Sequence, residues 1–289
     1  MPAFSVSQKI FIARQLNRLL RFARGLFGLG MQVRCRRDGL NWELDLNEGI
    51  DLSIYLLGAY EPHTIKAYAP LIRPGAVVFD IGANIGAHTL HFARLAGPTG
   101  RVFAFEPTEF ACAKLRANLA LNPALAERVS LQQFFLVAHR AVTTPPTVAA
   151  SWPVADSGET NAWHGRAEDS SRAAAVTADD FCARAGVTRI DFVKLDVDGH
   201  EWSVLQGFSE TLARFRPVIV VEIAPFIYAG VKAREFDDFI RFLDGLGYCF
   251  TNVNTGRTIS PCADELRRTI TPGGGINALL LPPRTGPLG

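Results

Sequence analysis

The sequence predicts a doubly wound α/β fold, in which a mostly parallel sheet carries helices on both faces. Three short runs, at residues 77–81, 190–197 and 218–223, have the composition of buried parallel strands. Helical patterns follow these runs, as the connections between parallel strands require. At 289 residues the chain is long enough to bury one large core. We therefore expect a single α/β domain with short additions.

Composition narrows the function classes. A net charge of +2 does not favour a nucleic-acid partner. The five cysteines are scattered without a C-x-x-C pair, which indicates a reducing compartment and no zinc site. No apolar run is long enough to cross a bilayer, and residues 2–30 show no cleavage pattern after an apolar core. These features predict a cytoplasmic protein.

Residues 1–30 hold a predicted amphipathic helix, at residues 9–27, with four arginines. The simplest interpretation is a helix that docks on the domain or a loosely held leader. The alternative is a basic face that lies on an anionic membrane or on another chain, as in a homodimer. Residues 28–47 then predict two short strands or a hairpin, most of which belongs to a lead-in of residues 31–75. Glu61-Pro62 then opens a helix that covers the sheet, because proline suits the first helical turn.

The central unit, residues 77–107, is a strand, a glycine turn, a helix and a second strand. The turn reads Asp80-x-Gly82-x-Asn84-x-Gly86, and its glycines let a ligand approach the backbone. Glu106 ends the second strand. Ligands of parallel sheets bind outside the carboxyl ends of the strands, so the two acids share one rim. The unit predicts a nucleoside site, with an ordinary turn as the alternative.

The spacing of this turn favours S-adenosylmethionine (SAM). A dinucleotide site requires G-x-G-x-x-G, whereas Asn84 holds the middle position here. Asp80 before the turn is a poor neighbour for a pyrophosphate and a good one for a cation. SAM carries a sulfonium and an ammonium and no phosphate. Glu106 suits the ribose diol of either cofactor.

The middle of the chain is less regular. Residues 129–137 predict a third strand, but no acid marks its end, so the adenine contact is poorly defined. Residues 139–176 form an insert without periodicity. Such inserts are often active-site lids, and the aromatic residues Trp152, Trp163 and His164 favour a loop that covers the substrate. Thr177-x-x-Asp180 then predicts the start of a helix.

A second group of polar residues follows the strand at residues 190–197. Asp196 lies at its carboxyl end, and Asp198, Gly199, His200 and Glu201 come directly after it. This strand is fourth by count and lies next to the first in the doubly wound order. Glu201 falls in the first turn of the next helix, where the helix dipole favours carboxylates.

The C-terminal part completes the sheet. Glu222 ends the strand at residues 218–223, and a divalent cation shared by Asp196 and Glu222 is left open, since two carboxylates do not define a site. The alternative is that Glu222 holds a substrate hydroxyl or Lys194 without a metal. Residues 236–246 predict an amphipathic helix and residues 248–253 a sixth strand. The triple glycine at residues 273–275 is a turn before the last strand, because no phosphate-loop Lys-Ser or Lys-Thr follows it.

Together, the glycine turn, Phe105-Glu106-Pro107 and the run from Lys194 to Glu201 resemble the FkbM-like family of class I SAM-dependent methyltransferases. The resemblance covers about residues 51–283, with a divergent middle. It implies a seven-stranded Rossmann-like sheet over residues 76–289, with an antiparallel terminal strand. It also implies that the helix after Glu61 closes over the cofactor and that Glu61 meets the methionine ammonium of SAM; a helix cap that faces water is the alternative for Glu61. The implied acceptor is a hydroxyl on a sugar, polyketide or similar molecule. Asp198 departs from the family, which has a glutamate there.

For methyl transfer, an enzyme holds the acceptor oxygen in line and takes its proton. Asp196 is expected to orient the acceptor hydroxyl or His200, and His200 is the candidate base, because an imidazole titrates near neutrality. The alternative for His200 is a helix cap or surface residue. Two rival interpretations remain. One is an NAD-dependent oxidoreductase, disfavoured by Asp80 and Asn84, and the other is a non-catalytic SAM-binding partner protein.

Overall fold

The computed structural model describes residues 6–155, 160 and 165–283. Its centre is a seven-stranded sheet in which five neighbouring strands run parallel. From edge to edge the strands are β12 (Cys249–Asn252), β13 (Ile276–Leu281), β11 (Val218–Ile223), β10 (Phe192–Leu195), β3 (Val77–Ile81), β4 (Arg101–Phe105) and β5 (Val129–Gln132). β13 runs antiparallel to both of its neighbours. This order is the class I methyltransferase sheet that the sequence predicts.

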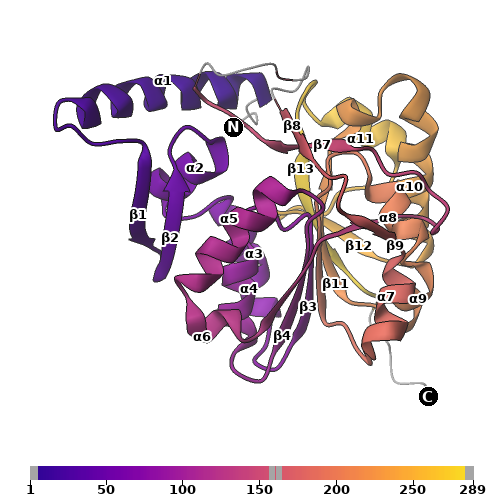
Figure 1. Ribbon diagram of the computed structural model, residues 1–289. Helices are drawn as coiled ribbons and strands as arrows, with labels where there is room; N and C mark the ends of the chain where they lie inside the picture. The colour runs from indigo at the N-terminus through magenta and orange to yellow at the C-terminus, as the bar shows by residue number, and fades with distance from the viewer. Residues whose placement is uncertain (1–5, 156–159, 161–164, 284–289) are drawn as a thin grey trace.

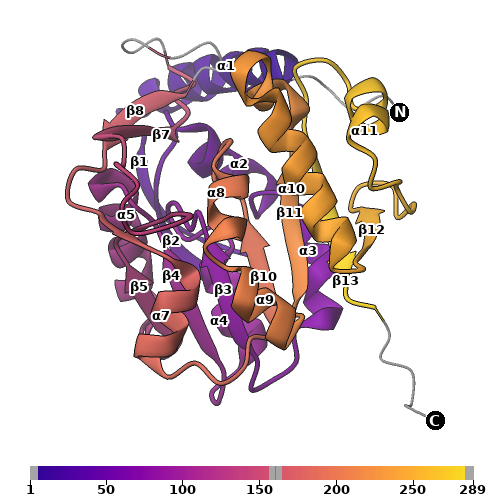
Figure 2. The ribbon, with the colours of Figure 1, turned by 90° about the vertical axis from the view of Figure 1, so that its right-hand side faces the viewer.

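Helices cover both faces of the sheet (Figure 1). One face carries α3 (Pro62–Tyr68), α4 (Thr89–Ala96), α5 (Glu109–Ala120) and α6 (Pro123–Ala126). The other carries α7 (Ala178–Ala185), α8 (Glu201–Gln206), α9 (Ser209–Phe215) and α10 (Ala233–Gly245), which Figure 2 shows from the front. α11 (Ala263–Thr269) and the short helices η1 (Ala69–Leu71), η2 (Pro225–Tyr228) and η3 (Gly230–Lys232) lie in connections.

Alternation along β3 builds a core on each side of the sheet. Phe79 stacks on Phe208, the residue before α9, with ring centroids 5.8 Å apart, whereas Val78 packs on the opposite face with Phe92 of α4. All four side chains are fully buried. Burying each of them stabilises the fold by about 1.5–3 kcal/mol. The sheet is therefore fixed from both sides.

The lead-in folds on the α5 face. The hairpin of β1 (Gln32–Arg37) and β2 (Leu40–Asp45) is followed by α2 (Gly49–Leu57), which the sequence does not predict. Trp42 and Leu44 are fully buried and share a core with Leu115 of α5. The backbone N–H of Glu43 donates to Oδ1 of Asn118, at 2.8 Å. The N-terminal helix α1 (Val6–Gly25) lies across this segment.

Two sequence predictions need correction. The strand expected over residues 129–137 divides: β5 stays in the sheet, while β6 (Phe134–Leu136) pairs with β9 (Ala174–Val176) outside it. Between them, Gln133 leaves the sheet and bonds Oε2 of Glu109 at 3.1 Å. The insert is also more regular than its pattern indicates, since β7 (Thr147–Ser151) and β8 (Arg166–Asp169) form an antiparallel hairpin. Exposure does not alternate along β7, so this strand has no two-residue pattern that the sequence could show.

Residues at the helix ends explain where several helices begin and end. Thr177 caps α7 by accepting from the N–H of Asp180 at 3.0 Å, and Gly186 ends that helix with a left-handed backbone. Pro62 holds the first position of α3. No helix in the described part of the chain is long and apolar enough to cross a membrane.

Candidate active site

The glycine turn after β3 is packed against the loop after β10. Gly82 has a φ of +83°, and a Cβ there would lie 1.8 Å from the backbone oxygen of Asp196. Gly86 has a φ of +89°, and its Cβ would lie 2.4 Å from Cδ1 of Leu115. Only glycine tolerates both the dihedral angle and the close approach. The turn therefore joins the ends of β3 and β10 in one rigid rim.

Asp80 is the buried acid of this rim, with 1% of its surface exposed. Its Oδ2 accepts from the Thr89 hydroxyl at 2.5 Å, while Oδ1 is buried without a partner among the described residues. Burial raises the pKa of Asp80, and the nearby Lys194 opposes that change. A buried acceptor without a donor costs about 1–3 kcal/mol. A ligand that brings a hydrogen-bond donor or a cation fits this atom.

Glu106, at the end of β4, is held from two sides. Its Oε2 accepts from the backbone N–H of Asn84 at 3.0 Å, and its Oε1 accepts from the N–H and hydroxyl of Thr108 at 2.9 and 2.6 Å. Burial raises the pKa of Glu106, and the Thr108 bonds work against it. Each carboxylate oxygen can accept more than one bond, so the fixed carboxylate remains suited to a diol.

Glu61 and Tyr60 approach the rim from the lead-in. Glu61 precedes α3 with a left-handed backbone, and its Oε2 lies 3.4 Å from Nε2 of His88. Burial works to raise the pKa of Glu61, but His88 and Lys194 outweigh it and lower the pKa to about 2. The pKa of Tyr60 lies well above its usual value because of burial and the charges of Glu61 and Asp196. Tyr60 therefore keeps its proton and can donate.

Lys194 is the buried cation at the centre of these acids. It is 3% exposed, and its Nζ donates to Oδ2 of Asp196 at 2.7 Å. Burial alone would lower the pKa of Lys194, but the carboxylates of Asp196, Asp80 and Glu61 raise it above its usual value. The sequence offers Lys194 only as a partner for Glu222, and its central position among Asp196, Asp80 and Glu61 was not predicted. Its only signal was a lysine inside a run that is otherwise a buried strand.

Three carboxylates gather at the other end of the rim. One oxygen each of Asp196, Asp198 and Glu222 lies within 4.8 Å of the others. The pKa of Glu222 is well above its usual value because of burial and the charges of Asp196 and Asp198. Oxygen ligands of this kind suit magnesium. Acid clusters also occur without an ion, so the cluster alone assigns no metal.

A buried clamp fixes the loop that carries these acids. The carboxylate of Glu201 accepts from the backbone N–H groups of Val197, at 3.1 Å, and of Gly199, at 3.1 and 3.3 Å. The hydroxyl of Tyr228, in η2, donates to the same carboxylate. The sequence places Glu201 at a helix start, where the helix dipole favours a carboxylate. The structure shows that the same carboxylate also holds the backbone of the preceding loop.

His200 directly follows this loop, at the N-cap of α8. Its ring meets that of Phe135 edge to face, with centroids 5.4 Å apart. Burial and the charge of Lys232 lower its pKa to about 4, so the imidazole is neutral at physiological pH. Within the described part of the chain, no hydrogen bond or ion pair joins it to Asp196. The structure thus gathers Glu61, Asp80 and Asp196 around Lys194, while His200 borders the group.

The insert reaches the glycine turn directly. The side-chain amide of Asn84 donates to the backbone oxygen of Ala150 in β7, at 2.9 Å. The hairpin is also tied to the lead-in: the carboxylate of Glu48 accepts from Ser151 at 2.7 Å and from Arg166 at 3.2 Å. Trp152 bonds Gly49 through its backbone. Trp163 and His164, the other candidate covering residues, lie outside the described residues.

Comparison with known proteins identifies relatives of this chain. Residues 80–250 match the "Methyltransferase FkbM domain" family. The 2-O-methyltransferase NoeI of Sinorhizobium fredii is 28% identical over 159 residues, which cover 50% of this chain and 63% of NoeI. The hexuronic acid methyltransferase AglP of Haloferax volcanii is also 28% identical over 159 residues, which cover 55% of this chain and 59% of AglP.

A shorter segment is more similar to a third relative. The 31-O-demethyl-FK506 methyltransferase FkbM of Streptomyces tacrolimicus is 53% identical over 58 residues, which cover 20% of this chain and 22% of that protein. In all three alignments the chain spans less than two thirds of the relative's own length.

Proposed function

Because this chain belongs to the FkbM family of class I SAM-dependent methyltransferases, we propose that it methylates a hydroxyl oxygen of an acceptor molecule. When bound, SAM supplies an electrophilic methyl group on its sulfonium. The observation that carries the proposal is the single rim on which the cofactor acids, Asp80 and Glu106, meet Asp196 through the close packing at Gly82. The family assignment decides against the NAD-dependent rival.

The cofactor site we propose consists of Glu61, Asp80, Glu106 and the turn from Gly82 to Gly86, which includes Asn84. The unpartnered Oδ1 of Asp80 and the Oε2 of Glu61 suit a cationic ligand such as the SAM ammonium. Glu106, already fixed by Asn84 and Thr108, suits the ribose diol. These are carboxylate oxygens, as the positive groups and hydroxyls of SAM require.

In the proposed mechanism, Asp196 accepts a hydrogen bond from the acceptor hydroxyl and so aims its oxygen. Lys194 holds the Asp196 carboxylate in place at 2.7 Å. His200 is neutral, with a pKa of about 4, and is the candidate to take the acceptor proton as the oxygen becomes methylated. The lead-in of residues 31–75 and the insert of residues 139–176 would exclude water from this space.

For the acceptor, we propose a polyhydroxylated sugar or a polyketide-like molecule. The names of the relatives point to such acceptors, since they specify a 2-O position, a hexuronic acid and a 31-O position. Asp196, Asp198, Glu222 and Tyr60 present hydrogen-bonding oxygens, which suits an acceptor with several hydroxyl groups.

The deciding experiment is isothermal titration with SAM, S-adenosylhomocysteine and NAD. We expect micromolar binding of both adenosyl ligands and none of NAD. Asp80→Ala and Glu106→Ala should each weaken adenosyl binding about 10- to 100-fold, because each removes charged hydrogen bonds. Binding of NAD alone would overturn the proposal.

An acceptor screen with purified protein tests the oxygen preference. Products are compared by mass and by the position of the added methyl group. Repeating the positive reactions with a chelator, and then with added magnesium, decides whether the carboxylates of Asp196, Asp198 and Glu222 act through a cation. Binding of SAM with no turnover on any acceptor would support the rival view of a non-catalytic partner protein.

A further inference from the structure

Helix α1 packs on the rest of the molecule through one side only. Asn17 is buried there, and its side-chain amide donates to the backbone oxygen of Leu46 at 2.7 Å. Arg21 donates to Oδ1 of Asn47, also at 2.7 Å. Ala13 and Leu20 complete the contact by packing on the lead-in core. The helix is thus fixed on the lead-in, while apolar side chains on its opposite side are exposed within the described part of the structure.

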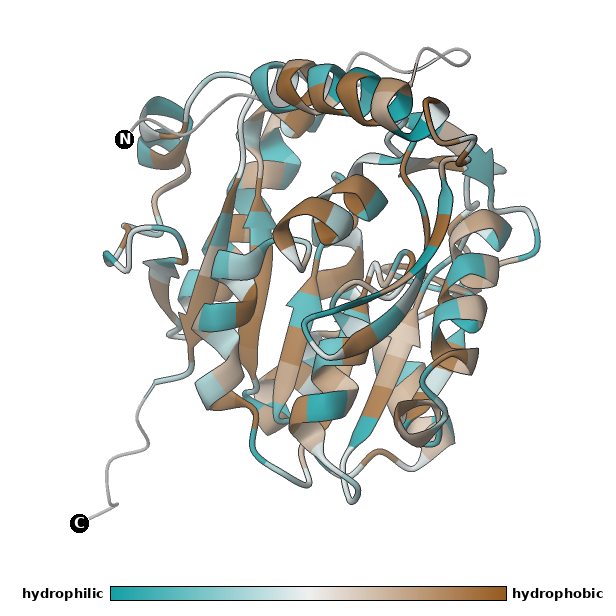
Figure 3. Cartoon of the chain, turned by 90° about the vertical axis from the view of Figure 1, so that its left-hand side faces the viewer, coloured by the Kyte–Doolittle hydropathy of each residue, from teal (hydrophilic) through white to brown (hydrophobic). Residues whose placement is uncertain are grey.

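The side of α1 that faces away from the lead-in is mostly apolar. On a helix of about 3.6 residues per turn, five exposed side chains share one sector of α1. They are Phe11 (63% exposed), Ile12 (43%), Leu16 (42%), Leu19 (67%) and Phe22 (70%). Leu26 and Phe27 extend the exposed apolar residues just beyond the helix. Figure 3 shows hydrophobic and hydrophilic residues alternating along α1. Contiguous exposed apolar residues of this kind mark an interaction surface.

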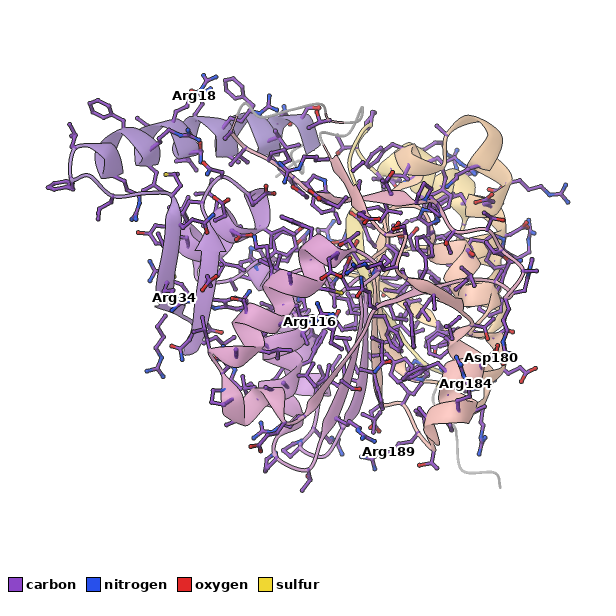
Figure 4. All side chains as sticks on the ribbon, viewed as in Figure 1. Arg18, Arg34, Arg116, Asp180, Arg184 and Arg189 are labelled. Atoms are coloured by element: carbon purple, nitrogen blue, oxygen red, sulfur yellow. The ribbon has the colours of Figure 1, made fainter. Side chains whose placement is uncertain are left out.

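The charges of α1 are all of one sign. Five of the chain's 30 Lys and Arg residues lie in α1, which holds no Asp or Glu, so the remainder has 25 basic and 28 acidic residues. Lys9 and Arg18 fall at the two borders of the apolar sector, and Figure 4 shows Arg18 on the outer side of the helix. No ion pair is described for Lys9, Arg14, Arg21 or Arg24 within the residues that the structure covers. Lys9 is exposed and makes no ion pair with the described residues, so its charge is available to an anionic surface.

We propose that α1 docks the protein on an anionic lipid bilayer, with the apolar sector in the acyl boundary and Lys9 and Arg18 at the headgroups. An interfacial helix combines an exposed apolar face with basic residues on the polar face. A second copy of this chain fits less well. In a two-fold dimer the same helix would face itself, and basic residues would meet basic residues without an acid between them.

Docking in this way turns a defined end of the molecule towards the bilayer. Leu46 and Asn47, which hold α1, directly precede Glu48, which bonds Ser151 and Arg166 of the insert. Figure 1 shows α1 and the β7–β8 hairpin at the same end of the structure. The hairpin in turn contacts the glycine turn through Asn84. The membrane thus adjoins the segments that border the candidate site.

The test is flotation of the full chain with two kinds of vesicle, one of phosphatidylcholine alone and one of equal parts phosphatidylcholine and phosphatidylglycerol. We expect binding to the anionic vesicles, weakened about tenfold or more by high salt. The double variant Phe11→Ser/Phe22→Ser and the double variant Lys9→Glu/Arg18→Glu should each lose at least about tenfold in partitioning. Both variants change exposed residues, so circular dichroism should show an unchanged fold.

The matched control is Leu71→Ser/Leu281→Ser, which removes exposed apolar side chains from outside α1 and should bind as the parent does. Failure to bind anionic vesicles would overturn the proposal. Equal binding to both vesicles, or equal loss in the control, would also overturn it. If light scattering showed instead a dimer that Phe11→Ser/Phe22→Ser dissociates, without vesicle binding, the face would belong to a second copy. None of these outcomes depends on methyl transfer.

Discussion

The two ends of the candidate rim hold their carboxylates in opposite ways. At the ends of β3 and β4, Asp80 accepts from Thr89, and Glu106 accepts from Asn84 and Thr108. At the ends of β10 and β11, no hydrogen bond is described to the carboxylates of Asp198 and Glu222, and Asp196 has one, from Lys194. The first end is fixed by the protein, while the second leaves its oxygens available.

This difference matches the roles we propose for the two ends. A cofactor that is the same for every acceptor is bound best by acids whose positions are fixed before the cofactor binds. An acceptor with several hydroxyl groups is bound best by oxygens that are not already engaged. The second end carries a cost, because burial and the repulsion of neighbouring carboxylates raise the pKa of Glu222. Lys194 offsets part of that repulsion.

The sharpest way to separate the two ends is Asp196→Asn. It removes the charge that we assign to orienting the acceptor, so kcat should fall about 100- to 10,000-fold. The dissociation constant of S-adenosylhomocysteine should change less than about threefold, because Asp80 and Glu106 are untouched. Steady-state kinetics and titration measure the two quantities.

A surface control for this variant is Asp264→Asn, whose carboxylate is 84% exposed. It should leave both kcat and cofactor binding unchanged. If Asp196→Asn kept kcat within about threefold of the parent, the acceptor end would not depend on Asp196, and the division of roles would be wrong.

The two ends of the rim also differ in how much of their structure the sequence predicts. The strands at residues 77–81 and 218–223, and the cap at Thr177, follow from short-range patterns and are found as expected. The turn and both cofactor acids stand within one continuous stretch. Their residues were therefore predictable, although their roles remain proposals.

The acceptor end was less predictable because its contacts cross the sheet. Lys194 interacts with the charges of Asp80, on the neighbouring strand, and of Glu61, in the lead-in. The bond between Asn84 and Ala150 joins residues 66 positions apart. The sequence also does not show that the chain leaves the sheet at Gln133, because Phe134 and Phe135 continue the apolar run. No short-range pattern contains these relations.

Gly82→Ala tests whether the two ends are one rigid unit. The new Cβ would lie 1.8 Å from the Asp196 oxygen, a backbone atom that cannot rotate away. We expect a loss of about 3 kcal/mol or more in the free energy of unfolding, together with weaker cofactor binding. Urea unfolding and titration check this. Gly256→Ala is the control, since its φ is also positive and nothing lies within 4 Å of its Cβ, so only about 1 kcal/mol should be lost.

Two buried tyrosines test whether the Glu201 carboxylate, which holds the loop after β10, matters for catalysis. Tyr228 donates to the carboxylate of Glu201, whereas Tyr248 donates to the backbone oxygen of Pro217, and both side chains are buried. Tyr228→Phe and Tyr248→Phe should each lower the free energy of unfolding by about 1–3 kcal/mol. Only Tyr228→Phe should also lower kcat/KM, by about tenfold, since it loosens the loop of Asp196 and Asp198. An equal kinetic effect in both variants would show that the clamp is purely structural.

The smallest expected effect is on the free energy of unfolding at low pH, to which the buried histidines His200 and His91 both contribute. Burial lowers the pKa of both, to about 4 for His200 and about 3 for His91, against roughly 6.5 in the unfolded chain. The unfolded state then binds more protons below about pH 6.5, so stability is constant above that pH and falls as the pH drops towards the folded value.

Glutamine at either position should therefore reduce the loss of stability between pH 7 and pH 5, by about 1 kcal/mol for the partly exposed His200 and somewhat more for His91. Urea titrations at the two pH values measure this. Only His200→Gln should also slow methyl transfer, and the parent's kcat should stay level from pH 8 down to about pH 5 before an acid limb near pH 4. An acid limb near pH 6.5, or an unchanged kcat in His200→Gln, would assign the proton to another group at the acceptor end.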